Sequence, residues 1–165
     1  MQKYVFRKYS TEYVKLFEFE EKIVKKALGD IAVIEHVGST AVKGLGGKGI
    51  IDIMVGVHLA DLDKAKMKLE KIGYEFRKIA TVPGRIFFRK DYVSKTKERR
   101  IHIHLVIKGS HEWSQIILFR DYLKRHEDEV VEYTEIKKQA VKTANGDGET
   151  YRKIKEKYIK GILNK

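Results

Sequence analysis

The sequence predicts an α+β domain built on a central mixed β-sheet, with helices before, within and after the sheet and a helical C-terminal third. Three observations predict this class. Segments rich in β-branched and aromatic residues recur between residues 31 and 107. Helix-like spacing of apolar residues occurs before these segments and dominates after residue 111. Long connections separate several strand-like segments, which indicates that some neighbouring strands run parallel.

The first half of the chain is expected to alternate helix and strand. Apolar side chains recur every three or four positions in Ser10–Leu28, which predicts a helix that ends at Gly29-Asp30. Two apolar segments rich in β-branched residues predict strands at Ile31–Val37 and Ile50–Val57. A second helix is predicted from about Asp61 to Ile72.

The second half is expected to contain three strands and then three helices. The strands are predicted, from their β-branched and aromatic residues, at Tyr74–Ile79, Ile86–Val93 and Arg99–Ile107. Helical apolar spacing predicts the helices at His111–Lys124, about Glu127–Thr143 and about Glu149–Ile162. No repeat, low-complexity tract or clear linker interrupts the sequence, so residues 1–165 are expected to form one domain.

Composition is typical of a folded protein without a membrane span. Apolar residues make up 42% and charged residues 35% of the chain, which favours a globular domain over a disordered one. No apolar run approaches the roughly 20 residues that cross a bilayer, and the N-terminus lacks a signal peptide's apolar segment. The absence of cysteine excludes disulfides and thiolate metal sites. A cytoplasmic protein with no membrane partner is expected.

The formal net charge of +12 raises nucleic acid as a partner. Much of the lysine, however, is interleaved with glutamate in helix-like segments such as Lys64–Lys71 and Lys153–Lys160. Mixed faces of this kind are usually solvated surface. A solvated helical face is therefore the favoured interpretation, and nucleic-acid binding is the alternative.

The stretch from His36 to Val57 is the most informative for function. Its two strand-like ends flank a loop with five glycines, the pair Ser39-Thr40 and two lysines. Glycines allow a backbone to approach a ligand closely, while free N–H, hydroxyl and ammonium groups suit a phosphate. Asp52 follows on the second strand, where a carboxylate beside a phosphate is placed to hold a divalent cation. The stretch therefore predicts phosphate and metal chemistry.

Strand alternation groups Asp52 with two histidines. Asp52 lies on one face of its predicted strand, opposite the apolar Ile51 and Ile53, and His102 and His104 share one face of theirs. If these strands are neighbours, the three side chains line one cleft. They are then candidate catalytic residues and candidate ligands of Mg²⁺, Mn²⁺ or Zn²⁺. The alternative is a histidine pair that is hydrogen-bonded on a solvated face.

Further cationic, hydroxyl and glycine residues are candidates for holding phosphate. The turn Pro83-Gly84 leads into a strand with arginines on either side of two phenylalanines, and an arginine fork suits phosphate. At least one of the two phenylalanines is expected to pack in the core, and stacking on a base is the alternative. Arg120 either pairs locally with Asp121 or faces the cleft. The candidate phosphate ligands are His36, Gly38, Ser39, Thr40, Lys48, Arg85, Arg89, Lys90, Arg120 and Lys155.

Several motifs occur in a recognisable order. They are His36-Val-Gly-Ser-Thr-Ala-Val, Gly44-Leu45, Lys48, Ile50-Ile51-Asp52-Ile53, Pro83-Gly-Arg, Phe87-Phe88-Arg89-Lys90, His102-Ile-His104-Leu-Val, Trp113, Phe119-Arg120-Asp121-Tyr122-Leu123, Tyr151 and Lys155. In this order the chain resembles the GrpB family, a group with a nucleotidyltransferase-like fold, over almost its whole length. The resemblance implies that fold, with Gly38-Ser39 and Asp52 in the nucleotidyltransferase signature positions. The family is also similar to a module fused to dephospho-CoA kinase in some bacteria.

The chain departs from the pattern of the family it resembles in two ways. The family commonly has prolines in the loop, where this sequence has Lys43, Gly46 and Gly49, so a more mobile loop is expected. Nucleotidyl transfer typically uses two cations held by several carboxylates in an acid-x-acid pattern, but Met54 stands two positions after Asp52. A thioether does not serve Mg²⁺, which prefers oxygen ligands, so a standard two-Mg²⁺ transfer is not expected.

Three functions are open from the sequence. The first is an enzyme that transfers or hydrolyses a phosphate-containing substrate, in which Asp52 with His102 or His104 holds one metal or acts as base. The second is a non-catalytic module that binds a nucleotide or coenzyme A-like ligand, and the third is a basic RNA-binding protein. Neither a Walker A motif nor a Gly-x-Ser-x-Gly elbow is present, which argues against kinases and ATPases. Binding of a phosphate-bearing small molecule is favoured, with nucleotidyl or phosphoryl transfer left open.

Overall fold

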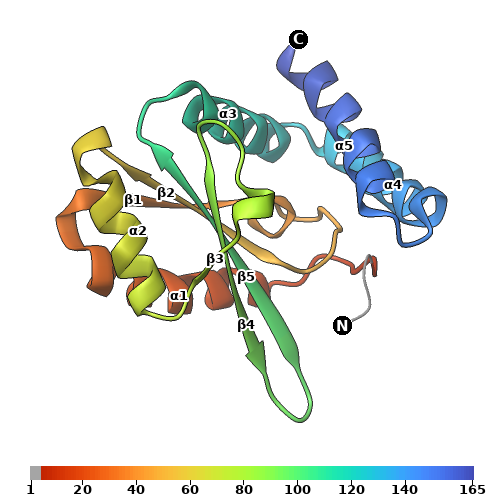
Figure 1. Ribbon diagram of the computed structural model, residues 1–165. Helices are drawn as coiled ribbons and strands as arrows, with labels where there is room; N and C mark the ends of the chain where they lie inside the picture. The colour runs from red at the N-terminus through yellow and green to blue at the C-terminus, as the bar shows by residue number, and fades with distance from the viewer. Residues whose placement is uncertain (1–4) are drawn as a thin grey trace.

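The computed structural model describes residues 5–165, and within them five strands form one mixed sheet in the order β1-β2-β5-β4-β3 (Figure 1). The strands are β1 Ala32–Val37, β2 Ile51–Val57, β3 Glu75–Phe76, β4 Ile86–Val93 and β5 Glu98–Ile107. Strands β2 and β5 run parallel, whereas the other neighbouring pairs are antiparallel. The mixed sheet that the sequence predicts is confirmed.

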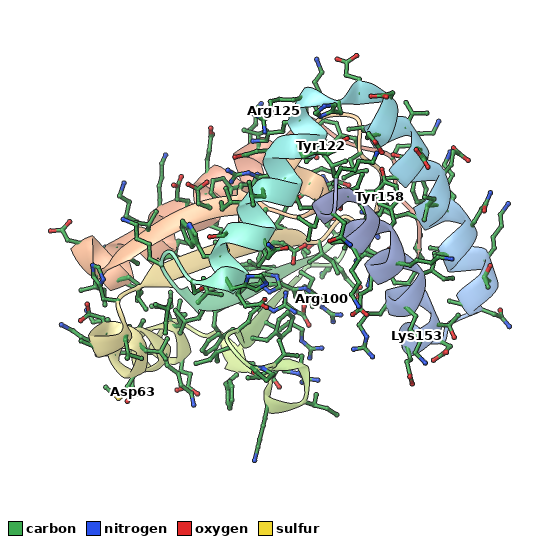
Figure 2. All side chains as sticks on the ribbon, turned by 90° about the horizontal axis from the view of Figure 1, so that it is seen from above. Asp63, Arg100, Tyr122, Arg125, Lys153 and Tyr158 are labelled. Carbon is green, nitrogen blue, oxygen red and sulfur yellow. The ribbon has the colours of Figure 1, made fainter. Side chains whose placement is uncertain are left out.

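The helices of the described chain lie on both faces of the sheet and beyond its end. They are α1 Glu12–Leu28, α2 Leu62–Lys71, α3 His111–Arg125, α4 Glu127–Ala144 and α5 Gly148–Leu163. Helices α1 and α2 pack on one face, α3 crosses the other, and α4 and α5 lie side by side past α3 (Figure 2). The predicted helical C-terminal third is confirmed. Within residues 5–165, no helix combines the length and apolar character needed to cross a bilayer.

Alternation along the two parallel strands divides the core between the faces of the sheet. One face, packed against α1 and α2, is formed by the fully buried Ile51, Ile53, Val55, Ile101, Ile103 and Leu105. The other face contains Met54, also fully buried, in a cluster against which Trp113 of α3 packs. Because both faces are covered, a slip of one residue would exchange the two sets of side chains, so the register is strongly specified.

A second apolar cluster joins the loop between β1 and β2 to the C-terminal helices. Val42 and Leu45 from the loop are buried with Leu123 of α3 and with Val130 and Tyr133 of α4. This cluster shares no residue with the core against α1 and α2. The glycine-rich loop is therefore held by the helices that follow the sheet, which brings α4 and α5 next to the start of β2.

The strand predicted at Tyr74–Ile79 is shorter than expected. Only Glu75–Phe76 pair with β4, and a 3₁₀ turn follows. The hydroxyl of Thr81 accepts the Phe87 amide hydrogen bond at 3.1 Å, which a longer strand would accept with a backbone carbonyl. Ile79, whose apolar side chain suggested a strand, is 92% exposed. The prediction is wrong beyond the second paired residue.

Glu20 of α1 is fully buried beneath the sheet and is paired with two tyrosines. The Tyr74 hydroxyl donates a hydrogen bond to Oε1 of Glu20, and the Tyr92 hydroxyl donates one to Oε2 at 2.9 Å. The ammonium of Lys90 lies 3.9 Å from Oε1. Burial raises the pKa of Tyr92 to about 12, and the bond to Glu20 adds to the effect. The buried carboxylate thus depends on donors fixed by β4 and by the segment before β3.

Replacing Glu20 with alanine is expected to lower the free energy of unfolding by about 3 kcal/mol, because two hydroxyls and an ammonium lose their buried acceptor. The exposed Glu18 on the same helix is the matched control, and Glu18→Ala should change this free energy by less than about 0.5 kcal/mol. Urea unfolding of the three proteins measures both effects. Equal stability of the two variants would show that the buried network does not stabilise the fold.

Candidate functional site

Asp52 lies at the start of β2, beside β5, with two histidines directed at it. Nε2 of His104 donates a hydrogen bond to Oδ1 of Asp52 at 3.0 Å, and Nδ1 of His102 lies 3.4 Å from the same oxygen. The exposed fractions of the three side chains are 22% for Asp52, 19% for His102 and 15% for His104. The structure therefore brings together, on one face of the sheet, the three residues that strand alternation groups.

The charges of this group are set by burial and by the hydrogen bonds. Burial alone would raise the pKa of Asp52, but the hydrogen bonds and charges of His102 and His104 hold it well below its usual range. Burial lowers the pKa of His104 by more than Asp52 raises it. At neutral pH the pair is thus a carboxylate and a neutral imidazole that donates from Nε2. Nδ1 of His104 is buried, with no hydrogen-bond partner among the described residues.

The loop after β1 presses its backbone against Asp52. Gly38 has φ +75°, and a Cβ there would lie 2.6 Å from Oδ2 of Asp52. A Cβ on Gly47 would likewise lie 2.5 Å from the hydroxyl oxygen of Ser39. Glycine is required at both positions by close approach, and at Gly38 by the left-handed backbone as well. Gly38 is therefore next to Asp52, and Ser39 follows it in the loop.

Three lysines converge on the same region from the loop, α4 and α5. The ammonium groups of Lys48 and Lys155 lie 4.7 Å and 5.3 Å from the centre of the Tyr151 ring. Burial, with Lys155 adding to it, lowers the pKa of Lys48 to about 8. Burial also lowers the pKa of Lys155, and Asp52 opposes the shift in both lysines. The two predicted ligands Lys48 and Lys155 are thus close to Asp52 and to each other.

Lys137 of α4 is the third lysine, and sequence reasoning missed it. Its side chain is buried, with 4% exposed, and its ammonium donates a hydrogen bond to the Gly46 carbonyl at 3.2 Å. Burial, Lys155 and Lys48 lower its pKa well below the usual value, and Asp52 again opposes them. The signal was present in the sequence, because Lys137 continues the three- and four-residue spacing of the buried Val130 and Tyr133.

The two predicted arginines of the β4 region lie on the Asp52 side. Arg89 is opposite His102 in the β4–β5 pairing and has ion-pair distances of 3.6 Å to both Glu75 and Asp91. Burial lowers the pKa of His104, and the charge of Arg85 adds to the effect. Nε of Arg85 is buried and has no hydrogen-bond partner within residues 5–165.

The remaining four predicted phosphate ligands make their contacts away from Asp52; they are His36, Thr40, Lys90 and Arg120. His36 shares the opposite face with Ile53, where it stacks on Phe17 at 4.4 Å and hydrogen-bonds to Thr40 at 2.9 Å. Burial lowers the pKa of His36 to about 4. The ammonium of Lys90 donates to a backbone carbonyl on the α2 side at 3.0 Å. Arg120 pairs locally.

The local partners of Arg120 fix α3 to the first strand. Its guanidinium donates to Glu35 at 2.6 Å, to Asp121 at 2.9 Å and to the His36 carbonyl at 3.0 Å. Of the two alternatives left open by the sequence, local pairing is the one observed. The guanidinium of Arg120 is therefore engaged in holding α3 against β1.

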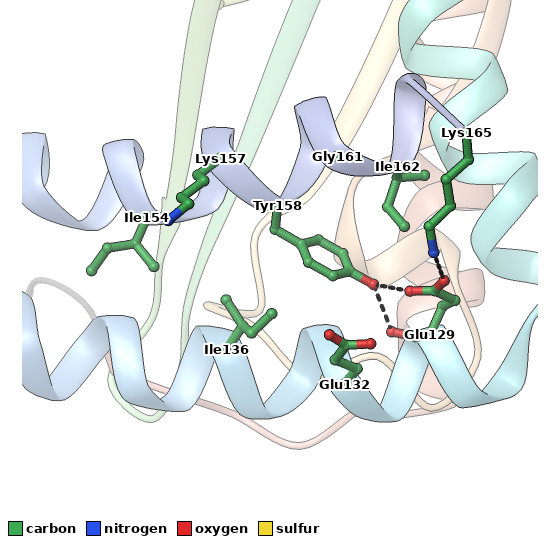
Figure 3. Close-up of a pocket in the computed structure, with 9 residues that line it drawn as sticks. All are labelled: Glu129, Glu132, Ile136, Ile154, Lys157, Tyr158, Gly161, Ile162 and Lys165. Carbon is green, nitrogen blue, oxygen red and sulfur yellow. Dashed lines mark hydrogen bonds and ion pairs between the residues drawn. The ribbon is translucent and has the colours of Figure 1, made fainter.

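A groove of about 390 Å³ lies between α4 and α5, apart from Asp52 (Figure 3). Ile136 and Ile154 line it, and Tyr158 reaches across to donate a hydrogen bond to Oε2 of Glu129 at 2.6 Å. Lys165 also pairs with Glu129. None of the site residues predicted from the sequence lines this groove. The hollow and the Asp52 group are separate features of the molecule.

Comparison with known proteins identifies the family. The sequence profile of a family described as GrpB protein matches residues 4–165. The chain belongs to the GrpB family. The glutamate-rich protein GrpB of Alkalihalophilus pseudofirmus is 32% identical over 161 residues, covering 94% of this chain and 91% of the relative. A UPF0157 protein of Halalkalibacterium halodurans is 31% identical over 159 residues, covering 95% of this chain and 79% of the relative.

Solved structures agree with the GrpB assignment and give the fold. The conserved protein GrpB from Enterococcus faecalis has a TM-score of 0.73 at 27% identity, covering 96% of this chain and 99% of that one. The MgGTP-bound Cid1 poly(U) polymerase has a TM-score of 0.58 at 16% identity, covering 82% of this chain and 44% of that one. The second likeness concerns the fold alone. The nucleotidyltransferase-like fold expected from the resemblance is confirmed.

The donor set of this GrpB chain does not fit the pair of divalent cations that nucleotidyl transfer typically uses. Met54 is fully buried against α3, and a thioether in place of the second acid is no ligand for Mg²⁺. Oδ1 of Asp52 is already directed at two imidazoles. Within residues 5–165, no group of three or more histidine, cysteine, aspartate or glutamate side chains is arranged to hold a metal ion. These residues therefore do not fit the pair of Mg²⁺ ions.

The substitution Gly38→Ala tests the close approach of the GrpB loop to Asp52. It is expected to lower the free energy of unfolding by more than about 2 kcal/mol, because it adds a clash to a left-handed backbone. Gly161→Ala on α5 is the control, since a Cβ there meets nothing within 4 Å, and it should stabilise by up to about 1 kcal/mol. Thermal unfolding compares the two, and an unaffected Gly38 variant would contradict the geometry.

Proposed function

We propose that the protein binds the phosphate groups of a small molecule, a nucleotide or a coenzyme A-like compound. The proposed cleft lies where the glycine-rich loop, the start of β2 and the helices α4 and α5 meet. The observation that carries the proposal is the convergence of Lys48, Lys137 and Lys155 around the single carboxylate of Asp52. Around Asp52, three lysine side chains thus face one carboxylate at a partly buried site.

An anion is the natural partner for such a place. Burial of an ammonium without a compensating charge is unfavourable, and lysines near one another add repulsion. Burial lowers the pKa of Lys48 and of Lys137, Lys155 adds to the effect in both, and Asp52 only partly offsets it. A phosphate with two negative charges would relieve this repulsion and accept hydrogen bonds from the ammonium groups. The arrangement of these groups therefore favours binding of a phosphate over binding of a neutral ligand.

The loop and its surroundings add donors to the same cleft. Lys48 lines a small hollow of about 50 Å³ together with Arg7 and Arg100. The hollow is large enough for a water-sized group and is bordered by two guanidinium groups and the carboxylate of Glu98, and Arg100 pairs with Asp91 at 2.7 Å. Ser39 and the backbone of Gly47 are in contact on the other side of the loop. Lys48 thus has two basic neighbours, and the loop adds a hydroxyl group.

The fold supports a nucleotide as the phosphate-bearing molecule. Structures of Cid1, which share the fold, are described as bound to MgGTP and to a UTP analogue. Gly38, Ser39 and Asp52 of this chain occupy the signature positions that its family resemblance implies. The same cleft would serve transfer of a nucleotidyl or phosphoryl group, in which Asp52 orients His102 and His104. Binding comes first in either case, and it is the part that an experiment can address directly.

The first test is thermal unfolding with ATP, coenzyme A and inorganic tripolyphosphate. A ligand at one hundred times its Kd adds roughly 2.7 kcal/mol to the stability, which for this chain length raises Tm by about 5–10 °C. Lys155→Met is expected to reduce the affinity at least about tenfold, because it removes an ammonium and keeps the side-chain length. Isothermal titration calorimetry measures the loss.

Lys160→Met is the matched control on the same helix, since Lys160 is exposed. It should leave the affinity for these compounds unchanged. Loss of binding in both variants would point to diffuse attraction by the basic surface, and binding of RNA alone would favour the nucleic-acid alternative. Absence of binding by all three compounds would reject the proposal.

Affinity is expected to fall as pH rises through about 8, the lowered pKa of Lys48. Below that pH, Lys48 is an ammonium that attracts phosphate, and above it the group is neutral. Phosphate is ionised throughout, so the loss should approach about tenfold per pH unit above 8. Lys48→Arg should weaken this dependence, because a guanidinium stays charged while Lys137 and Lys155 still lose their protons as pH rises. Titrations between pH 7 and 9.5 would show it, and identical profiles for the two proteins would exclude Lys48.

A further inference from the structure

We propose that the cleft neutralises its ligand with lysines in place of divalent cations, so that the metal-free form of an oligophosphate or nucleotide is the species it binds. The inference rests on the proposed function, because it concerns the same cleft. It differs from what the fold alone suggests, since Cid1 is described with magnesium-bound nucleotide. Three features of the described residues support it.

The first feature is the enclosure of Asp52 by groups of its own protein. Its Oδ1 atom is approached by two imidazoles, at 3.0 Å from His104 and 3.4 Å from His102. Its Oδ2 atom faces Gly38, and a Cβ added to Gly38 would lie only 2.6 Å from that oxygen. The carboxylate thus serves as an acceptor that holds two histidines, and the glycine backbone closes the other side. A cation bridging Asp52 to a phosphate would have to displace these neighbours.

The second feature is the side chain that follows Asp52 on the same face of β2. Met54 is fully buried with Val37 and Val106, and Trp113 packs against the cluster. A second acid at this position would be forced into an apolar cluster without a partner, which is strongly unfavourable. The packing beneath the site is therefore built for a thioether and not for a second carboxylate ligand.

The third feature is that three lysines already surround the carboxylate. Lys48 comes from the loop, Lys137 from α4 and Lys155 from α5, and all three are close enough to Asp52 for its charge to act on them. Lys137 is held in place by the Gly46 carbonyl. A magnesium complex of a nucleotide carries two fewer negative charges than the free form, and its cation would face three like charges. The free form should therefore bind more tightly.

The role of Asp52 then differs from that of a metal ligand. Where a metal links protein and phosphate, loss of the carboxylate removes the link. In a cleft neutralised by lysines, the negative charge of Asp52 repels the phosphate, so its removal favours binding. The substitution Asp52→Asn retains an oxygen that accepts from the histidines while it removes the charge. Its effect on affinity thus has opposite signs in the two cases.

Isothermal titration calorimetry with inorganic tripolyphosphate and with ATP, each in excess EDTA and in excess Mg²⁺, tests the inference. We expect binding in EDTA that is at least about tenfold tighter than in Mg²⁺, and equal or tighter binding by Asp52→Asn in EDTA. Lys137→Met should lose at least about tenfold in EDTA, whereas Lys138→Met, a more exposed neighbour on α4, should not. Circular dichroism and thermal unfolding establish that each variant is folded, and Lys155→Met replaces Lys137→Met if the latter is not.

The outcomes separate the inference from the proposed function. Binding that requires Mg²⁺, equal affinity in the two buffers, or loss of binding in Asp52→Asn would overturn the lysine-neutralised cleft while leaving phosphate binding intact. No binding of either compound in either buffer would reject the proposed function itself, and the inference with it.

Discussion

Strands β2 and β5 run parallel and place Asp52 opposite His102, and the other parts of the candidate site are arranged around that register. A slip of one residue would place an isoleucine opposite His102 and turn the carboxylate into the apolar core. Packing opposes such a slip on both faces, through Ile53 against α1 and α2 and through Met54 against α3. The same pair of strands therefore forms the centre of the fold and holds one carboxylate against two imidazoles. The packing that stabilises the core therefore also fixes the positions of these three side chains at its edge.

The loop between β1 and β2 links this edge to the C-terminal helices. Val42 and Leu45 anchor it in a separate apolar cluster with α3 and α4, and its glycines allow it to lie against Asp52 and over Lys137. The positive groups of the cleft come from the loop and from two consecutive helices much later in the sequence. Their convergence depends on the helices packing on the loop and not on the sheet, so the charge of the site and the attachment of the helices are aspects of one arrangement.

Local patterns in the sequence predict most of the fold and the centre of the site. Alternation along single strands groups Asp52 with His102 and His104, since that grouping needs only a period of two and a guess that the strands are neighbours. Alternation also puts Arg89 and Lys90 on opposite faces of the sheet, although both were predicted as phosphate ligands because of their positive charge. Lys137 was missed because a lysine is expected at the surface, while helical spacing placed it inward. The end of β3 was mispredicted because a threonine hydroxyl from outside the strand takes over its hydrogen bonding, which no periodicity within the strand reveals.

Because the two apolar clusters share no residue, the parts of the molecule that they hold together can open independently. One cluster is sealed between the sheet and α1 and α2, and the other belongs to the loop and the helices after the sheet. Segments that hold together mainly through their own small cluster can open without disruption of the remainder. An anion bound by lysines from the loop, α4 and α5 would link these segments and stabilise their packing against one another. Occupancy of the cleft would then be reported by slower amide exchange in α4 and α5.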